Sequence, residues 1–63
     1  MQIGKKLRDL RRKKRMRQKE LAAMSGISNT YLSDIENSRT VPSLKTLVRL
    51  CAALEVDIKE MFD

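Results

Sequence analysis

The apolar residues of this 63-residue chain recur at spacings of three and four positions and never alternate over a useful length. This spacing is the period of an amphipathic α-helix, whereas a half-buried strand needs an apolar side chain at every second position. Only two glycines and one proline interrupt the pattern, so little of the chain is left for long loops. The sequence therefore predicts a single all-α domain over residues 1–63, with one small core.

Five short helices account for the periodicity. Their predicted ranges are 2–14, 18–25, 28–36, 43–54 and 57–62. Gly26 is expected to close the second helix, because glycine takes the left-handed conformation easily. Ser28 and Ser43 are predicted N-caps, and Asp57 followed by Glu60 resembles a capping box that begins the fifth helix.

The side chains predicted to face the core come from every helix. In the first three helices they are Ile3, Leu7, Leu10, Leu21, Ala22, Met24, Tyr31, Leu32 and Ile35. The fourth helix is expected to be the most buried, with a broad apolar face of Leu44, Leu47, Val48, Leu50, Cys51, Ala52, Ala53 and Leu54.

The composition argues against an enzyme, a metal site or a membrane span. One cysteine, Cys51, and no histidine exclude an internal disulfide, a zinc ligand set and histidine acid–base chemistry. The longest uninterrupted apolar run, residues 50–54, is too short to cross a bilayer, and the N-terminus lacks the apolar stretch of a secretory signal. We therefore expect a cytoplasmic binding module with no catalytic residues, cofactor, metal or small-molecule ligand.

Positive charge is concentrated at one end of the chain. The net charge is +6, but residues 1–19 hold ten Lys and Arg against one acid, whereas residues 20–63 hold four against seven. Dense positive charge beside a nearly neutral domain is typical of a partner that is a polyanion, such as nucleic acid or anionic lipid. The alternative interpretation is a solvated charged face that only maintains solubility.

Residues 18–37 have the pattern of two helices that cross closely. Ala22 lies where a second helix needs close approach, Gly26 makes the turn, and Ile27, Leu32 and Ile35 can fill the wedge between the helices. A helix-turn-helix has these requirements, and its second helix enters the major groove of DNA. A helical hairpin that serves only as a scaffold would need similar packing.

The outward face of the second of these helices carries short hydrogen-bonding side chains. Amides can pair with adenine, hydroxyls with several bases, and carboxylates with the N4 amino group of cytosine. Such side chains are also frequent near helix starts as caps. The residues predicted to contact bases are Asn29, Thr30, Ser33 and Asp34.

These motifs together resemble the phage repressor/Cro-type (Xre-type) helix-turn-helix domain over nearly all 63 residues. The resemblance rests on Ile3–Gly4, Leu7, Arg11, QKELA at 18–22, Gly26, YLSDIEN at 31–37, Pro42, Leu47 and LEV at 54–56. It implies a five-helix repressor-like bundle, encoded by a bacterium or phage, that binds palindromic operator DNA and regulates transcription as a repressor. It also implies a homodimer, which can be weak in the absence of DNA.

The resemblance, together with the charge distribution, assigns further residues to the DNA backbone. The predicted phosphate contacts are Arg11, Arg15, Arg17, Gln18, Ser28, Tyr31, Asn37 and Arg39. Glu36 matches a residue that pairs with an arginine of the first helix, here Arg11, in a structural role.

Three residues depart from the family pattern. Arg15 stands where relatives have a glycine that ends the first helix, so a left-handed turn there is expected to be strained. Arg17 replaces the usual Ser or Thr cap of the second helix, and Ser38 replaces a common glycine. The two arginines add positive charge near the expected phosphates.

The C-terminal residues Val56, Ile58, Met61 and Phe62 carry more apolar surface than a short terminal helix is expected to bury. This predicts that part of that surface meets a second copy of the chain. Two alternatives to a DNA-binding regulator stay open: a DNA-binding antitoxin or protein-interaction module of the same fold, and a basic amphipathic helix at 2–17 that binds a membrane surface or a calmodulin-type partner.

Overall fold

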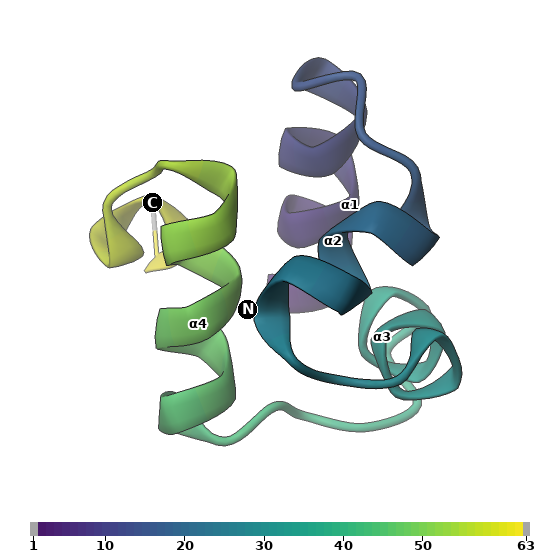
Figure 1. Ribbon diagram of the computed structural model, residues 1–63. Coiled ribbons are helices and arrows are strands. Elements are labelled where there is room, and N and C mark those ends of the chain that lie inside the picture. Colours follow the sequence, from purple (N-terminus) through teal and green to yellow (C-terminus); the bar gives the residue numbers. More distant parts are fainter. Residues whose placement is uncertain (1, 63) are drawn as a thin grey trace.

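The computed structural model describes residues 2–62, which form four α-helices and a terminal 3₁₀-helix and contain no strand (Figure 1). The elements are α1 (Ile3–Lys13), α2 (Gln18–Ser25), α3 (Asn29–Glu36), α4 (Leu44–Leu54) and η1 (Ile58–Phe62). The all-α prediction is confirmed. Three of the predicted ranges shorten because Gln2, Ser28 and Ser43 are N-cap residues that precede their helices.

The fifth element is not the expected α-helix. The backbone N–H of Glu60 donates to the carbonyl of Asp57, three residues back, at 3.0 Å. The Asp57 carboxylate accepts from the N–H of Lys59, and the Glu60 carboxylate accepts from the N–H of Asp57. Both side chains therefore cap the start of this element, as expected. Its five residues, however, form a tighter 3₁₀-helix and not an α-helix.

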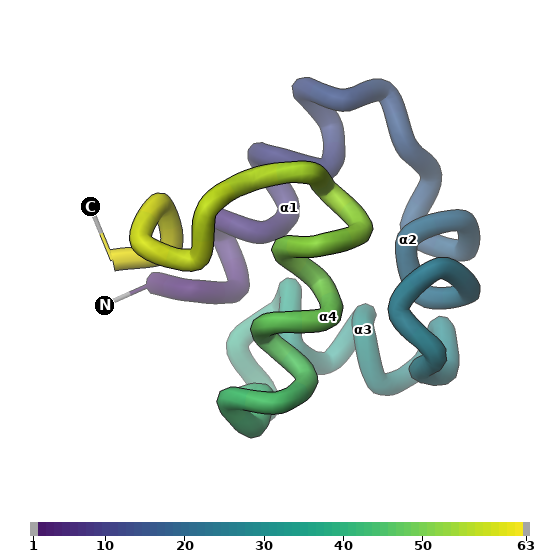
Figure 2. Tube along the Cα trace, turned by 60° about the vertical axis from the view of Figure 1, so that its left-hand side comes forward, coloured from purple at the N-terminus to yellow at the C-terminus, as the bar shows by residue number. Residues whose placement is uncertain are grey.

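The helices pack around one core, and each of them contacts at least two other elements. Helix α1 contacts α3 and η1, and α2 contacts α3 and α4. Figure 1 shows α2 and α3 crossing at one end of the molecule, with α4 on the other side of α2. Figure 2 shows that η1 returns to the start of α1, and the two elements are in contact.

Among residues 2–62, ten buried apolar side chains form the core: Leu7, Leu21, Ala22, Leu32, Ile35, Leu47, Leu50, Cys51, Leu54 and Met61. The apolar face predicted for α4 was too broad. Leu44 and Val48 are 68% and 50% exposed, and Ala52 is exposed as well. These three residues are spaced by four, so they form a stripe beside the buried one. Met24, expected inside, is 63% exposed.

The C-terminal apolar residues are mostly used inside the domain. Met61 is buried, and Val56 and Ile58 are half-buried against the core. Only Phe62 is largely exposed, at 51%. The segment buries more of its apolar surface than expected, because η1 folds back onto α1 and α4, and the part left for a second copy is smaller and centred on Phe62.

All four α-helices end in the same backbone turn. A left-handed residue follows each helix: Arg15, Gly26, Ser38 or Glu55, with φ of 57°, 71°, 60° and 58°. The next N–H donates to the carbonyl five residues back, as Met16 does to Arg11 at 3.1 Å and Ile27 does to Ala22 at 3.1 Å. This is the Schellman motif, which favours glycine, but only one of the four positions holds glycine. The expected left-handed turn at Arg15 is confirmed.

Gly4 sets how closely α1 approaches α3. A Cβ atom at Gly4 would overlap the backbone carbonyl oxygen of Ile35 and lie 3.1 Å from that of Glu36. Only a residue without a side chain fits between the start of α1 and the end of α3. The missing side chain therefore permits the close approach of α1 to the end of α3.

Candidate nucleic-acid interface

Helices α2 and α3 form the predicted helix-turn-helix. Gly26 makes the left-handed turn between them, and Ala22, Leu32 and Ile35 are buried where the helices meet. The Ser28 hydroxyl caps α3 by accepting from the backbone N–H of Tyr31 at 3.0 Å. The turn and the cap therefore fix where α3 begins and which of its faces points away from the core.

The free face of α3 carries the residues predicted to contact bases. Asn29 and Thr30 are exposed, and Ser33 and Asp34 are half-buried. Leu32 and Ile35 fill the opposite side, with exposures of 0% and 1%. Because all four polar side chains lie in one arc of a helix whose other arc is buried, they can be presented together to one partner.

Asn37 is tied to this face. Its Nδ2 donates to the carbonyl oxygen of Ser33 at 2.8 Å and lies 3.4 Å from the Ser33 hydroxyl. The side chain thus stabilises the last turn of α3, and its Oδ1 has no partner among the described residues. Asn37 remains exposed, so this contact leaves it accessible.

Arg11 does not belong with the phosphate contacts. It is 9% exposed, and its Nε and Nη2 donate to the two carboxylate oxygens of Glu36 at 2.8 and 3.0 Å. Its Nη1 donates to the backbone carbonyl of Met16 at 2.9 Å. Burial and this bidentate pairing with Glu36 correct the assignment of Arg11 to the DNA backbone, and they confirm the expected structural pair.

The N-terminal end of α2 presents the other cations. Arg15 and Arg17 are exposed and have no acidic partner among residues 2–62. Glu20 accepts from the backbone N–H of Arg17 at 2.9 Å, which supplies half of a capping box where Ser or Thr is missing. Gln18 is half-buried and donates from Nε2 to Glu36 at 3.2 Å.

One contact was not foreseen from the sequence. Nη1 of Arg39 lies 3.4 Å from Oδ1 of Asp34, so a predicted phosphate contact and a predicted base contact form an ion pair. The two residues are five positions apart, a spacing that brings side chains together only because the left-handed Ser38 folds the chain back over the end of α3. A helical period alone does not predict this pair.

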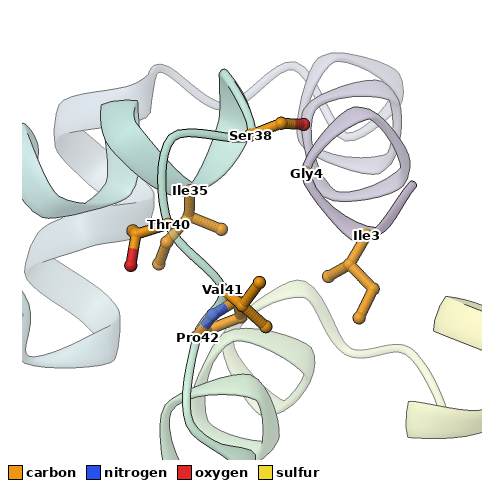
Figure 3. A pocket seen from close by; sticks show the side chains of 7 residues that line it. All are labelled: Ile3, Gly4, Ile35, Ser38, Thr40, Val41 and Pro42. Atoms are coloured by element: carbon orange, nitrogen blue, oxygen red, sulfur yellow. The ribbon is translucent and has the colours of Figure 1, made fainter. Parts of the chain in front are cut away.

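A hollow of about 280 Å³ lies next to the end of α3. Ile3 of α1 faces Val41 and Pro42 of the α3–α4 loop across it, with Ser38 close to α1 (Figure 3). None of the described residues that line it carries a charged side chain. No cluster of residues 2–62 has the composition to hold a metal ion. None of the helices in this range is long and apolar enough to span a membrane.

The chain belongs to the helix-turn-helix family, whose model matches residues 7–61. Among curated proteins, it is 45% identical over 56 residues to the 10 kDa protein of the ImmF control region of Bacillus phage phi105, covering 89% of this chain and 62% of that protein. Other curated relatives are named as HTH-type transcriptional regulators or as an immunity repressor. This chain spans about half the length of most of these relatives.

Two solved structures are similar along their whole length. The restriction-modification controller protein C.AhdI from Aeromonas hydrophila superposes with a TM-score of 0.94 at 33% identity, covering 97% of this chain and 92% of that one. The Bacillus subtilis regulator SinR, solved in complex with DNA, superposes with a TM-score of 0.91 at 32% identity, covering 97% and 98%. The helix-turn-helix fold is therefore shared with proteins of this family at close agreement.

Proposed function

We propose that this chain is the DNA-binding domain of a transcriptional repressor that recognises operator DNA through α3. The observation that carries the proposal is the polar face of α3, where Asn29, Thr30, Ser33 and Asp34 lie together. At the start of α2, the exposed cations Arg15 and Arg17 have no acidic partner among residues 2–62. The similarity to SinR, whose structure contains DNA, supports the same use of this fold.

In this function α3 enters the major groove. Asn29 can form a bidentate contact with adenine, Thr30 and Ser33 can donate to or accept from base edges, and Asp34 can accept from a cytosine amino group. The phosphate backbone is held from both ends of the helix-turn-helix. The residues for these contacts are Arg15, Arg17, Gln18, Ser28, Tyr31, Asn37 and Arg39.

Palindromic recognition requires two copies of the chain. One copy is at most 25 Å long, whereas successive major grooves on one side of DNA are about 34 Å apart. Apolar surface for a partner copy remains outside the core at Val41, Leu44, Val48 and Phe62, which are 50–80% exposed. The interface of a homodimer, weak without DNA, is therefore expected to include the α3–α4 loop and α4 and not η1 alone.

A domain that binds chromosomal or phage operators works in the bacterial cytoplasm, at the nucleoid. It needs no catalytic residue, cofactor or small ligand, because positioning and hydrogen bonding are its whole chemistry.

The experiment is a binding titration followed by fluorescence anisotropy, on a site selected from random duplexes and on a scrambled duplex, at several salt concentrations. Asn29→Ala and Thr30→Ala should weaken binding to the selected site by about 1–3 kcal/mol each and leave the scrambled duplex almost unchanged. The dependence of log K on log salt should keep its slope, since neither side chain is charged.

Arg17→Ala is the matched control. It should weaken both duplexes alike and reduce the slope by up to about 1 unit. Equal weakening of both duplexes by Asn29→Ala would contradict α3 as the reading helix. Absence of binding to any duplex would favour the protein-interaction alternative.

A further inference from the structure

Asp34 and Arg39 are held together by the backbone as well as by their charges. The N–H of Arg39 donates to the carbonyl of Asp34 at 2.8 Å, and the side chains meet at 3.4 Å. The turn at Ser38 makes the backbone contact possible. An exposed ion pair usually contributes little because two long side chains must be ordered, but here the turn has already placed both residues side by side.

The pair leaves a specific set of hydrogen-bonding groups free. Among the described residues, Oδ2 of Asp34 and the Nη2 and Nε groups of Arg39 have no partner, and the side chains are 39% and 69% exposed. One acceptor therefore lies beside several donors on the free face of α3. A C·G base pair offers the complement in the major groove, since cytosine N4 donates and guanine O6 and N7 accept.

The charges of Asp34 and Arg39 also favour a contact of this pair with a base pair. A lone carboxylate close to DNA is repelled by the phosphates. Beside Arg39 the Asp34 carboxylate belongs to a pair without net charge, so it can approach the groove. A pure phosphate contact, such as Arg17, has no acid beside it in residues 2–62.

We propose that Asp34 and Arg39 act as one unit that selects a C·G base pair, so that Arg39 determines sequence choice as well as overall affinity. This rests on the proposed function. Asp34 accepts from the cytosine amino group, while Arg39 orients the carboxylate, offsets its charge and has Nη2 and Nε free to donate to the guanine of the same pair.

The test measures binding to the selected site and to every single base-pair substitution of it, for the wild type and four variants. The variants are Asp34→Ala, Arg39→Ala, Arg39→Gln and the control Arg17→Ala. In the wild type, replacing the C·G pair contacted by Asp34 by T·A should weaken binding about 10-fold, within the usual range for one base pair. In Asp34→Ala and in both Arg39 variants this ratio should fall to about 2-fold or less, while the preferences at other positions persist.

In Arg17→Ala the ratio at that base pair should stay near its wild-type value although every duplex binds more weakly. The proposal is overturned if Arg39→Ala and Arg39→Gln weaken all duplexes by one common factor and keep the cytosine preference, because Arg39 then contacts only phosphate. A wild type that discriminates among no duplexes overturns both this proposal and the proposed function. Circular dichroism melts of each variant establish that it is folded, which the exposure of both side chains leads us to expect.

Discussion

Arg11 and Glu36, 25 positions apart, form a buried bidentate ion pair with Nε···Oε2 and Nη2···Oε1 distances of 2.8 and 3.0 Å. Their side chains are only 11% and 2% exposed. Met16 and Gln18 complete the network from the turn and from the start of α2. The position of α3 relative to α1 and α2 is thus set by directional polar contacts in addition to core packing.

Removing one member of this pair should destabilise the domain strongly. Arg11→Met or Glu36→Leu leaves an uncompensated charge in a buried site, and we expect a loss of about 3–5 kcal/mol in the free energy of unfolding. The double variant, in which both charges are replaced by apolar groups, should recover most of this loss. Urea unfolding followed by circular dichroism measures all three, and single variants as stable as the wild type would contradict the expected role.

Glycine at the left-handed helix ends should stabilise the protein. Glu55→Gly removes a positive φ of 58° from a side-chain-bearing residue, which should raise the free energy of unfolding by about 1 kcal/mol. Glu55→Ala keeps the strained backbone and removes the same side chain, so it serves as the control and should not be stabilising. Thermal melts compare the two, and equal effects would show that backbone strain is not the cause.

Arg15→Gly should separate stability from DNA affinity. It relieves a positive φ of 57° and so should stabilise the fold by a similar amount. It also removes an exposed cation, which should weaken binding to every duplex and flatten the salt dependence by up to about 1 unit. A glycine variant that binds DNA as tightly as the wild type at low salt would exclude Arg15 from the phosphate contacts.

Gly4→Ala should be more damaging than its small size suggests. The new methyl group would overlap the carbonyl oxygen of Ile35, so α1 must move away from α3. We expect a loss of about 1–3 kcal/mol, as for an overpacked core. Gly26→Ala is an informative comparison, because its Cβ meets nothing within 4 Å and the loss there comes from a φ of 71° alone. Urea titrations of both variants provide the measurement.

Cys51 should be unreactive in the native protein. The residue is 3% exposed, and burial, with smaller contributions from Glu60 and Asp57, raises the pKa of its thiol above the ordinary value. A raised pKa means a smaller thiolate fraction at pH 8, and thiolate is the reactive form. Alkylation by iodoacetamide at pH 8 should therefore be slow in buffer and fast in urea. A native rate close to the unfolded rate would contradict the burial of this side chain.

The same pKa direction predicts how Cys51 affects stability at alkaline pH. The folded state retains the thiol proton at pH values where the unfolded chain has lost it. The unfolded state then binds fewer protons, so this group's contribution to stability should decline as pH rises above the unfolded pKa. Cys51→Ala should show a weaker decline in urea titrations between pH 8 and 10, after allowance for its lower stability throughout.

The helices were largely predictable from local sequence. Apolar spacing and the caps at Ser28 and Ser43 predicted the ranges of α1 to α4 within one residue at each end, because these signals act within a few positions. The left-handed turn at Gly26 was predictable for the same reason, whereas the one at Arg15 was expected only from the family resemblance. The polar face of α3 could be identified as soon as Leu32 and Ile35 were assigned to the core.

Tertiary structure decided what periodicity leaves open. Leu44 and Val48 satisfy the helical spacing as well as Leu47 and Cys51 do, but the width of the contact with α2 decides which stripe is buried. The return of η1 onto α1 likewise buried Met61.

The sequence by itself determined the helix-turn-helix, the concentration of positive charge in residues 1–19 and the residues on the free face of α3. These follow from side-chain chemistry and from a period that does not depend on distant residues. The resemblance implied that Arg11 pairs with Glu36, but only the tertiary structure decided that this pair is buried, which removes Arg11 from the phosphate contacts, and that Asp34 is paired with Arg39. The first depends on how closely α1 approaches the end of α3, and the second on the turn at Ser38, because an arginine forms its hydrogen bonds with whichever acceptor the fold brings within reach.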